Sequence, residues 1–445
     1  MMRKISHRGR DNRKTIQKHG ALIQSSWHDI EENADLSVLK NKLVWDGNPP
    51  LEINPRALAQ WPRPYALAAV RPQGLFLARD PLGVKPLYYG EANGDFFFAS
   101  EVKALLAVTD DINEFPPGHC FSLEDGFQLC ERIKTGELPY DEVEKIVVEL
   151  HSRLEKAIER DVVSGPMGVW LSGGVDSSVI ATLAKKQVRE LHSFVIGLEG
   201  ATDLKYGGQV ASLLGTRHHS YTVKMEDLLP ILPSTIYALE SFDALLVRSS
   251  VTNYLISGIV SDYVDAIFSG EGGDELFAGC AYMKDIPAEK LPTALEKAVG
   301  SLHNTAFQRV DRSAFSQGIV PLLPFADLDV VNYAMSIPIK YKIYRKGNVE
   351  IEKWILRKTI EDMIPDSILW RPKTKFWQGT GLKEMLGDYA ERQISDSAFE
   401  RERKLPNGWK LNTKEELMYY RIFTEQFGEL DQLAWIGRTE GAPVQ

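Results

Sequence analysis

The feature that most constrains this chain is a short apolar segment that leads into a pair of glycines flanked by serines. Residues 169–178 read Val-Trp-Leu-Ser-Gly-Gly-Val-Asp-Ser-Ser, and a helical pattern follows. Glycines allow the backbone to turn tightly and to approach a ligand closely. The N-terminus of a helix offers unpaired N–H groups and a positive dipole end to an anion. This segment therefore predicts a cradle for a phosphate group, with the serine hydroxyls as further donors.

Asp176 lies inside the predicted phosphate cradle. A carboxylate close to phosphates is favourable only when a divalent cation lies between them, so Asp176 is predicted to bind Mg²⁺. The segment lacks the lysine of a Walker A loop. The alternative is a Gly-Ser turn that only caps a helix, but the preceding strand, the following helix and the embedded acid favour the cradle.

A second glycine-rich loop follows another apolar segment. Residues 265–268 predict a strand, and Ser-Gly-Glu-Gly-Gly-Asp-Glu at 269–275 adds three acids. Ligands of parallel sheets bind beyond the carboxyl ends of the strands, so both loops are expected to border one crevice. Asp274 is the predicted second Mg²⁺ ligand, Glu271 the group that stabilises or deprotonates an incoming amine, and Glu275 a helix cap. The alternative for this loop taken alone is an acidic surface turn.

Strands and helices alternate around these two loops. Strand patterns cover residues 168–171, 192–198, 219–223 and 265–269, and helical patterns cover residues 179–186 and 208–214. Such alternation is typical of a doubly wound α/β domain with a parallel sheet. The remainder of the chain is mainly helical in pattern.

The first 130 residues have a different pattern. Short apolar runs at residues 65–70, 75–78 and 96–100 lie between turn residues, and Asn93-Gly94 is a signal for a tight hairpin. A helical pattern at residues 141–162 follows. Because 445 residues exceed the size of one ordinary domain, we predict a β-rich domain over residues 1–130 and an α/β domain over residues 131–445.

Composition narrows the classes of function. A formal net charge of −9 disfavours a nucleic-acid partner, and no apolar run is long enough to span a bilayer. Three cysteines without a C-x-x-C pair suit a reducing compartment. We therefore expect a cytoplasmic protein that acts on small molecules, with neither nucleic-acid nor membrane partners.

The two loops resemble those of the glutamine-dependent asparagine synthetases. Residues 172–178 are similar to the pyrophosphate loop of that family, and residues 269–275 to its second loop. Trp370-Arg371-Pro372-Lys373 resembles a late loop whose lysine contacts the ATP phosphates, and residues 7–11 and 78–88 also match the family. The resemblance implies an α/β domain of the ATP pyrophosphatase type (adenine nucleotide alpha hydrolase-like). It also implies a preceding Ntn-hydrolase-like β-sandwich, the glutaminase domain.

The resemblance further implies roles for single residues. ATP and Mg²⁺ are the implied cofactors, a small carboxylate with ammonia or an amine the implied substrates, and a homodimer is compatible with the family. Glu271, Lys373 and Arg248 are implied to be catalytic. The implied nucleotide-binding residues are Leu171, Ser172, Gly173, Gly174, Asp176, Ser177, Ser178, Ile196, Gly197, Ser269 and Gly270, and the implied Mg²⁺ ligands are Asp176 and Asp274.

Two parts of the chain depart from the family pattern. Residue 2 is methionine where glutaminase chemistry needs an N-terminal cysteine, and Asp46-Gly47-Asn48 matches the oxyanion segment only in part. The stretch 48–65 is too short for the loop that grips glutamine. We therefore expect a truncated, degenerate glutaminase-like domain. At residues 320–327 apolar residues replace a glutamate and an arginine of the family, which leaves aspartate as substrate open.

Three functions are consistent with these observations. The first is an asparagine-synthetase-like ligase that adenylates a carboxylate, aspartate by resemblance, and transfers ammonia to it. The second is an adenylating lactam or peptide cyclase that uses an internal amine. The third is a nucleotide-binding relative without catalysis, which the retained Asp176, Glu271, Asp274 and Lys373 disfavour.

Overall fold

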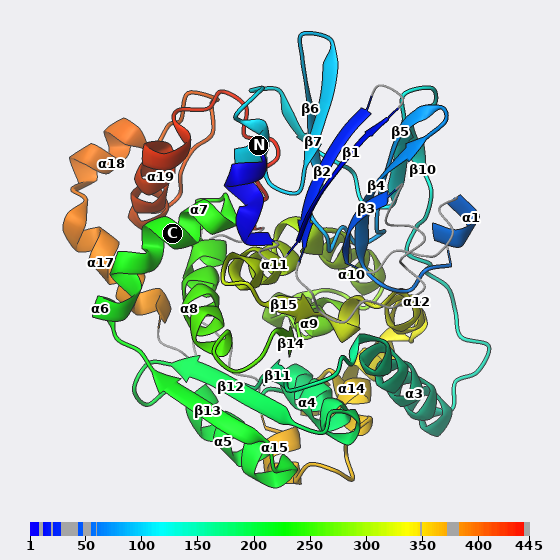
Figure 1. Cartoon of the computed structure of the whole chain (residues 1–445). Coiled ribbons are helices and arrows are strands. Elements are labelled where there is room, and N and C mark those ends of the chain that lie inside the picture. The colour runs from blue at the N-terminus through cyan, green and yellow to red at the C-terminus, as the bar shows by residue number, and fades with distance from the viewer. Residues whose placement is uncertain are drawn as a thin grey trace.

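The computed structural model of the chain describes residues 1–8, 12–18, 21–27, 43–47, 55–58, 60–347, 349–371 and 382–439. The N-terminal strands form layers of their own, which pack on a larger region built around a parallel sheet (Figure 1). Among the residues described, no helix has the length and apolar character needed to cross a membrane.

The N-terminal region contains two antiparallel sheets and a hairpin. The larger sheet has the order β10-β9-β5-β4-β3, the smaller one the order β7-β6-β8, and β1 pairs with β2. Apolar side chains from all three parts, including Ile23, Leu77 and Phe115, share one core. The strands are β1 (Asn12–Lys18), β2 (Ala21–Trp27), β3 (Leu43–Gly47), β4 (Tyr65–Arg71), β5 (Gly74–Arg79), β6 (Tyr88–Ala92), β7 (Asp95–Ala99), β8 (Ile112–Glu114), β9 (His119–Ser122) and β10 (Gly126–Leu129); the helices are η1 (Met2–Arg8), α1 (Pro55–Leu58) and α2 (Val102–Leu105).

The hairpin predicted at Asn93-Gly94 is confirmed. These two residues connect β6 to β7, and both have positive φ angles, 54° for Asn93 and 83° for Gly94. A two-residue turn of this kind matches the right-handed twist of the flanking strands.

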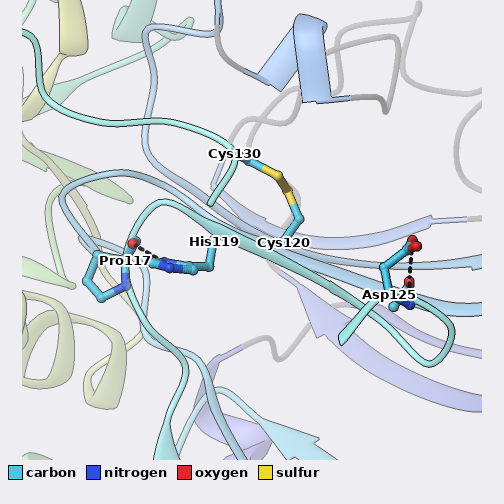
Figure 2. Close-up of a disulfide and its surroundings, with 6 residues drawn as sticks. Pro117, His119, Cys120, Asp125 and Cys130 are labelled. Atoms are coloured by element: carbon cyan, nitrogen blue, oxygen red, sulfur yellow. Dashed lines mark hydrogen bonds between the residues drawn. A yellow bond between two sulfur atoms is a disulfide. The ribbon is translucent and has the colours of Figure 1, made fainter. Parts of the chain in front are cut away.

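A disulfide joins Cys120 on β9 to Cys130, which follows β10 (Figure 2). The Cα atoms of the two cysteines lie 5.8 Å apart, across the end of the hairpin. The interpretation of the cysteines as a sparse set typical of a reducing compartment was therefore wrong. It relied on sequence spacing, whereas the pairing depends on the hairpin that brings residues 120 and 130 together.

The C-terminal region is built on a parallel sheet with the order β13-β12-β11-β14-β15. All four pairings are parallel, which confirms the predicted doubly wound arrangement. Side chains of α3, α4 and α5 pack with β11 on one face, and side chains of α8 and α11 pack with β12 on the other. The strands are β11 (Met167–Trp170), β12 (Leu191–Gly197), β13 (Arg217–Thr222), β14 (Ala266–Phe268) and β15 (Val320–Leu322); these helices are α3 (Val143–Asp161), α4 (Val175–Gln187), α5 (Thr202–Leu214), α8 (Ala244–Val260) and α11 (Ala306–Ser316).

Two details of this region differ from the sequence prediction. Helix α4 begins at Val175, four residues before the predicted start, so Asp176, Ser177 and Ser178 belong to its first turn. Strand β15 was not predicted, because its central residue is Pro321, and a proline within an apolar run argues against a strand inside a sheet.

The remaining elements are mostly helical, as expected. Helices α17 and α19 pack with α7 and α8 around a second apolar core. The elements are α6 (Met225–Leu228), η3 (Leu229–Ile231), α7 (Leu232–Leu239), α9 (Gly273–Leu276), η4 (Ala281–Asp285), α10 (Leu291–Gly300), η5 (Leu302–Asn304), η6 (Pro324–Ala326), α12 (Leu328–Ser336), α13 (Ile339–Lys342), β16 (Ile343–Lys346), β17 (Val349–Glu352), α14 (Trp354–Lys358), α15 (Asp366–Leu369), α17 (Leu382–Gln393), α18 (Asp396–Glu402) and α19 (Lys414–Phe427).

Glu131 is a buried acid at the junction of the two regions. Its backbone N–H donates to the Gly118 carbonyl at 3.0 Å, directly after the disulfide. The residue is only 7% exposed, and within the described part of the chain neither carboxylate oxygen has a hydrogen-bond partner. Burial raises the pKa of Glu131 to about 7; the positive charge of Lys134 opposes this shift and the Asp80 carboxylate adds to it.

This shift predicts how Glu131 affects stability. The ordinary glutamate pKa is 4.5, so the folded state favours the neutral acid, and its contribution to stability is lost as the pH rises from about 4.5 to about 7. We expect the ionised form to cost about 1–2 kcal/mol of stability. Replacing Glu131 by Gln is expected to raise Tm by about 2–4 °C at pH 8 and to leave Tm unchanged at pH 4.5. Thermal unfolding of Glu124→Gln, an exposed site, is the control, and an equal response of both variants would contradict the prediction.

Candidate active site

The first glycine-rich loop connects β11 to α4. Gly173 has a φ of 71°, and a Cβ atom there would lie 2.4 Å from the backbone of Tyr206, so only glycine fits. The Ser172 hydroxyl accepts a hydrogen bond from the Gly174 N–H at 3.2 Å and lies 3.1 Å from the Ser177 hydroxyl. The loop thus folds back on itself and leaves the N-terminus of α4 at the carboxyl end of the sheet.

Ser178 is an unsatisfied donor in the first turn of α4. Its residue exposure is 2%, and its hydroxyl has no hydrogen-bond partner among the described residues. Buried hydroxyls are nearly always hydrogen-bonded in native proteins. An exception at a helix N-terminus, where N–H groups are also unpaired, is consistent with a place for an anion.

The second glycine-rich loop follows β14. The Ser269 N–H donates to the Leu322 carbonyl of β15 at 2.9 Å, and the Glu271 N–H donates to the Ser269 hydroxyl at 3.3 Å. Gly272 then adopts a φ of 94° and starts α9, which carries Asp274 and Glu275 in its first turn. Glu275 was predicted to cap this helix, but the N-cap position is Gly272 and no side chain makes a capping hydrogen bond there.

The two loops are in direct contact. A Cβ atom on Gly270 would lie 2.9 Å from the Ser177 nitrogen, and one on Gly273 would lie 2.6 Å from an oxygen of Asp176. Any larger residue at these glycines would push the second loop away from α4. At the carboxyl ends of β11 and β14, where a crevice was predicted, the two loops therefore lie close together. The glycines make this close approach possible.

Asp176 and Asp274 share one cation, the ammonium group of Lys353. The Lys353 Nζ forms an ion pair with Asp176 Oδ2 and lies 2.5 Å from Asp274 Oδ1. Lys353 is 2% exposed and has a φ of 55° at the N-cap of α14. Burial opposes the charge on Lys353, but the two carboxylates outweigh it and raise its pKa above the ordinary value. The Lys353 ammonium group thus occupies the place where Mg²⁺ was predicted from the sequence.

Arg371 connects the late segment of the chain to the first loop. Its Nη2 donates to the Gly173 carbonyl at 3.0 Å, and its guanidinium lies 4.2 Å from the centre of the Tyr206 ring. Burial raises the pKa of the neighbouring Asp203 to about 7, although the Arg371 charge lowers it. Ile196 and Gly197 end β12 at the same edge of the sheet, and Val223 N–H donates to the Gly197 carbonyl at 3.0 Å.

Glu271 forms an ion pair with Arg309 of α11. The side chains are 31% and 13% exposed, respectively. Next to this pair, burial raises the pKa of Glu275 to about 8, and the Asp274 and Glu271 carboxylates raise it further. The second loop therefore concentrates negative charge that Lys353 and Arg309 offset from two sides.

Arg248, which was predicted to be catalytic, pairs with a residue outside the two glycine-rich loops. Arg248 is buried in α8, where its Nε donates to Glu415 Oε1 of α19 at 2.6 Å, and Tyr419 donates to the same oxygen at 2.8 Å. The structure assigns Arg248 to the contact between α8 and α19 and does not group it with Lys353, so its catalytic role has no geometric support. Lys373 lies outside the described residues, as does Asn48 of the predicted oxyanion segment.

Lys353, Arg309 and Arg371 were missed by the sequence interpretation. None of them lies in a glycine-rich loop, and Lys353 pairs with an acid 177 residues away. One signal was present: two acids predicted to converge require a cation, and a lysine is an alternative to a metal ion.

The Lys353 contact leads to a prediction about metal binding. Replacing Lys353 by Met leaves Asp176 and Asp274 without their shared cation, which is expected to lower stability by about 2–3 kcal/mol when divalent metals are chelated. Carboxylates are ligands for Mg²⁺, and in the variant the Lys353 ammonium group no longer competes for them, so added Mg²⁺ is expected to raise Tm more in the variant than in the unchanged chain. Thermal unfolding with EDTA and with Mg²⁺ measures both effects.

Lys284→Met is the matched control, because Lys284 pairs with Glu352 at 2.9 Å outside this site. An equal Mg²⁺ response in all three proteins would contradict the assignment of Asp176 and Asp274 as metal ligands.

Most of the chain is similar in sequence to known protein families. Residues 149–296 and 287–439 match the family model described as asparagine synthase, and residues 28–107 match a glutamine amidotransferase domain. The chain is 33% identical over 392 residues to asparagine synthetase [glutamine-hydrolyzing] 2 of Arabidopsis thaliana, covering 82% of this chain and 66% of the relative. It is 33% identical over 387 residues to asparagine synthetase B of Escherichia coli, covering 82% and 69%. The chain thus spans about two thirds of the length of these curated relatives.

Proposed function

This chain belongs to the asparagine synthase family, and we propose that it is an ATP-dependent carbon–nitrogen ligase that adenylates a carboxylate and converts it into an amide. The observation that carries the proposal is the convergence of Asp176 and Asp274 on one cation beside the N-terminus of α4. A helix N-terminus with buried donors suits phosphate groups, and the paired acids suit a cation that accompanies them.

In the proposed reaction an oxygen of the substrate carboxylate attacks the α-phosphorus of ATP, and pyrophosphate leaves. Ammonia then attacks the carbonyl carbon of the acyl-adenylate, loses a proton, and AMP leaves. Most of the proposed nucleotide-binding residues belong to the first loop and the first turn of α4. The Ser178 hydroxyl, which has no hydrogen-bond partner among the described residues, is the proposed donor to the departing pyrophosphate. Positioned donors and charges of this kind stabilise the transition state without reorganisation.

Mg²⁺ fits the residues present. Asp176 and Asp274 would hold it, because both offer carboxylate oxygens at one place and Lys353 demonstrates that positive charge is favourable there. When bound, the ion supplies neutralisation of the phosphate charges. We propose that the Lys353 ammonium group, which lies at the same carboxylates, also contacts the phosphates. We propose Glu271 as the group that receives the ammonia proton or stabilises the ammonium form.

We propose aspartate and free ammonia as the first substrates to test. In this proposal residues 1–130 form a glutaminase-like domain of Ntn-hydrolase ancestry that no longer hydrolyses glutamine. The two packed sheets of the N-terminal region support the ancestry, and the short stretch between Asn48 and Tyr65 supports the loss of activity.

A second candidate is a cyclase that joins the adenylated carboxylate to an amine of the same molecule. It is favoured by Val320 and Leu322, which lie on β15 beside the second loop where the family carries a glutamate and an arginine. The Leu322 carbonyl accepts the Ser269 N–H, so these apolar side chains belong to the strand next to Glu271. A less polar acceptor than aspartate would suit them.

Release of pyrophosphate from ATP distinguishes these functions. We expect aspartate with ammonium chloride to stimulate release and to yield one amide per pyrophosphate, and glutamine to be a poor substitute for ammonium. Stimulation only by carboxylates that carry their own amine, without ammonium, would favour the cyclase. No stimulation by any carboxylate would leave the non-catalytic relative as the remaining function.

Replacing Asp176 by Asn tests the site itself. The change removes the charge that Lys353 and a metal ion contact, and we expect pyrophosphate release to fall at least about 100-fold, because about 3 kcal/mol of charge stabilisation is lost. Asp110→Asn is the control, because Asp110 is exposed in the N-terminal region. Unchanged release by Asp176→Asn would contradict the site assignment.

A further inference from the structure

Helix α11 lies between the N-terminal strands and the parallel sheet (Figure 1). Within one turn and a half it carries Phe307, Arg309, Asp311 and Arg312, whose side chains contact partners in two directions. One direction leads to the second glycine-rich loop and the other to the N-terminal region.

Toward the loop, α11 makes two contacts. Arg309 forms the ion pair with Glu271, and a Cβ atom on Gly272 would lie 3.4 Å from the Phe307 ring. Arg309 therefore restrains the Glu271 side chain through an ion pair, and Phe307 restrains the next residue, Gly272, through packing. The Glu271 side chain is 31% exposed and would otherwise be free to change rotamer.

Toward the N-terminal region, α11 contributes two buried charges. Asp311 accepts a hydrogen bond from Arg8 Nη1 at 2.7 Å and another from Arg8 Nη2 at 3.2 Å. Arg312 lies 3.1 Å from a carboxylate oxygen of Glu101 and 3.1 Å from one of Glu240. All five side chains are at least nine-tenths buried. Buried charges of this kind require their partners, so their geometry is closely constrained.

Glu240 strengthens the same connection from the ligase side. Its two carboxylate oxygens accept hydrogen bonds from the N–H groups of Val102 and Lys103, at 3.0 Å and 2.7 Å, and so cap α2 of the N-terminal region. The Gln308 side chain donates to the carbonyl of Leu239, the residue before Glu240, at 3.0 Å. Helix α11, residues 239–240 and α2 are thus joined by hydrogen bonds and ion pairs into one unit.

We propose that Arg309 is a positioning residue for Glu271, and that the N-terminal region fixes its position through Asp311 and Arg312. The N-terminal region then acts on the amide-forming step of the ligase even if it hydrolyses no glutamine. This inference rests on the proposed function, in which Glu271 faces the incoming amine. Misplacement of a reacting group by about 1 Å can reduce a rate about 100-fold, so a helix that sets the place of Glu271 influences amide formation directly.

The test separates the two half-reactions. In Arg309→Gln we expect first-turnover pyrophosphate release with aspartate and ammonium to stay within twofold, since Asp176 and Lys353 are unchanged. We expect steady-state amide formation to fall about tenfold. Acyl-adenylate that ammonia does not attack is hydrolysed by water to the carboxylate and AMP, so the amide formed per pyrophosphate released is expected to fall as well. Arg309→Lys keeps the charge and is expected to recover part of the loss. Arg421→Gln, which breaks the pair with Glu402 between α18 and α19, is the matched control.

Arg8→Gln tests the route through the N-terminal region without a change in the ligase region. It removes the two hydrogen bonds that Asp311 accepts from Arg8 and leaves Lys85 at 3.7 Å as the remaining cation, and we expect the yield of amide per pyrophosphate to fall in the same direction, about threefold. An equal loss of first-turnover pyrophosphate and amide in Arg309→Gln would indicate a merely structural role and would overturn the proposal. So would an unchanged yield.

Hydrogen exchange provides a readout that needs no turnover. We expect the backbone amides of residues 269–276 to exchange faster in Arg309→Gln and in Arg8→Gln than in the control and the unchanged chain. Absence of this change would overturn the positioning role, whatever the substrate is. Absence of pyrophosphate release by the unchanged chain, with faster exchange in both variants, would instead count against the proposed function alone.

Discussion

The site depends on one electrostatic constraint: Asp176 and Asp274, on separate loops, must share a positive charge. Two carboxylates this close repel each other, and in a partly buried site little solvent screens the repulsion. Lys353 resolves it in the ligand-free chain, and its 2% exposure indicates that the surrounding structure is built around this ion pair. The glycines at 270 and 273 exist to allow this approach, because a Cβ atom at either would contact residues 176–177. The same carboxylates are suited to bind a divalent cation when phosphates arrive.

Charge pairing also explains how distant parts of the chain are organised. Glu271 pairs with Arg309, and Arg312 of the same helix pairs with Glu101 and Glu240. Arg248 and Glu415 play a similar role between α8 and α19. In each case a buried charge can be accommodated only with its partner in place, so the pairs specify the relative positions of helices more than they add to stability.

The glycine-rich loops and the parallel sheet could be predicted from the sequence because their determinants are local. The Gly173-Gly174 pair, the flanking serines and the apolar strand before them lie within ten residues, and periodicity gives the strands and helices on either side. The convergence of Asp176 and Asp274 followed from one topological rule, that parallel strands present their carboxyl ends at one edge. Lys353 and Arg309 could not be predicted, because neither has a local pattern and their partners are far away in sequence. The resemblance implied a catalytic role for Arg248, which stays a prediction, and the structure adds a buried ion pair with Glu415 that no local pattern indicated. The Cys120–Cys130 disulfide was missed because it depends on the register of β9 and β10.

The interface between the two regions shows what the N-terminal region contributes to the ligase region apart from any chemistry of its own. Glu240 caps α2, and Arg312 and Asp311 find partners in Glu101 and Arg8. Without residues 1–130, Asp311 would lose Arg8, and the Arg312–Glu240 pair of the ligase region would lose Glu101 and the N–H groups of α2. A buried ion that loses a partner lowers stability by several kcal/mol. Charged residues of the N-terminal region are thus the partners of buried charges in the ligase region. The two regions are joined by the charges that they share, and α11 carries those charges within one turn of the arginine that contacts Glu271.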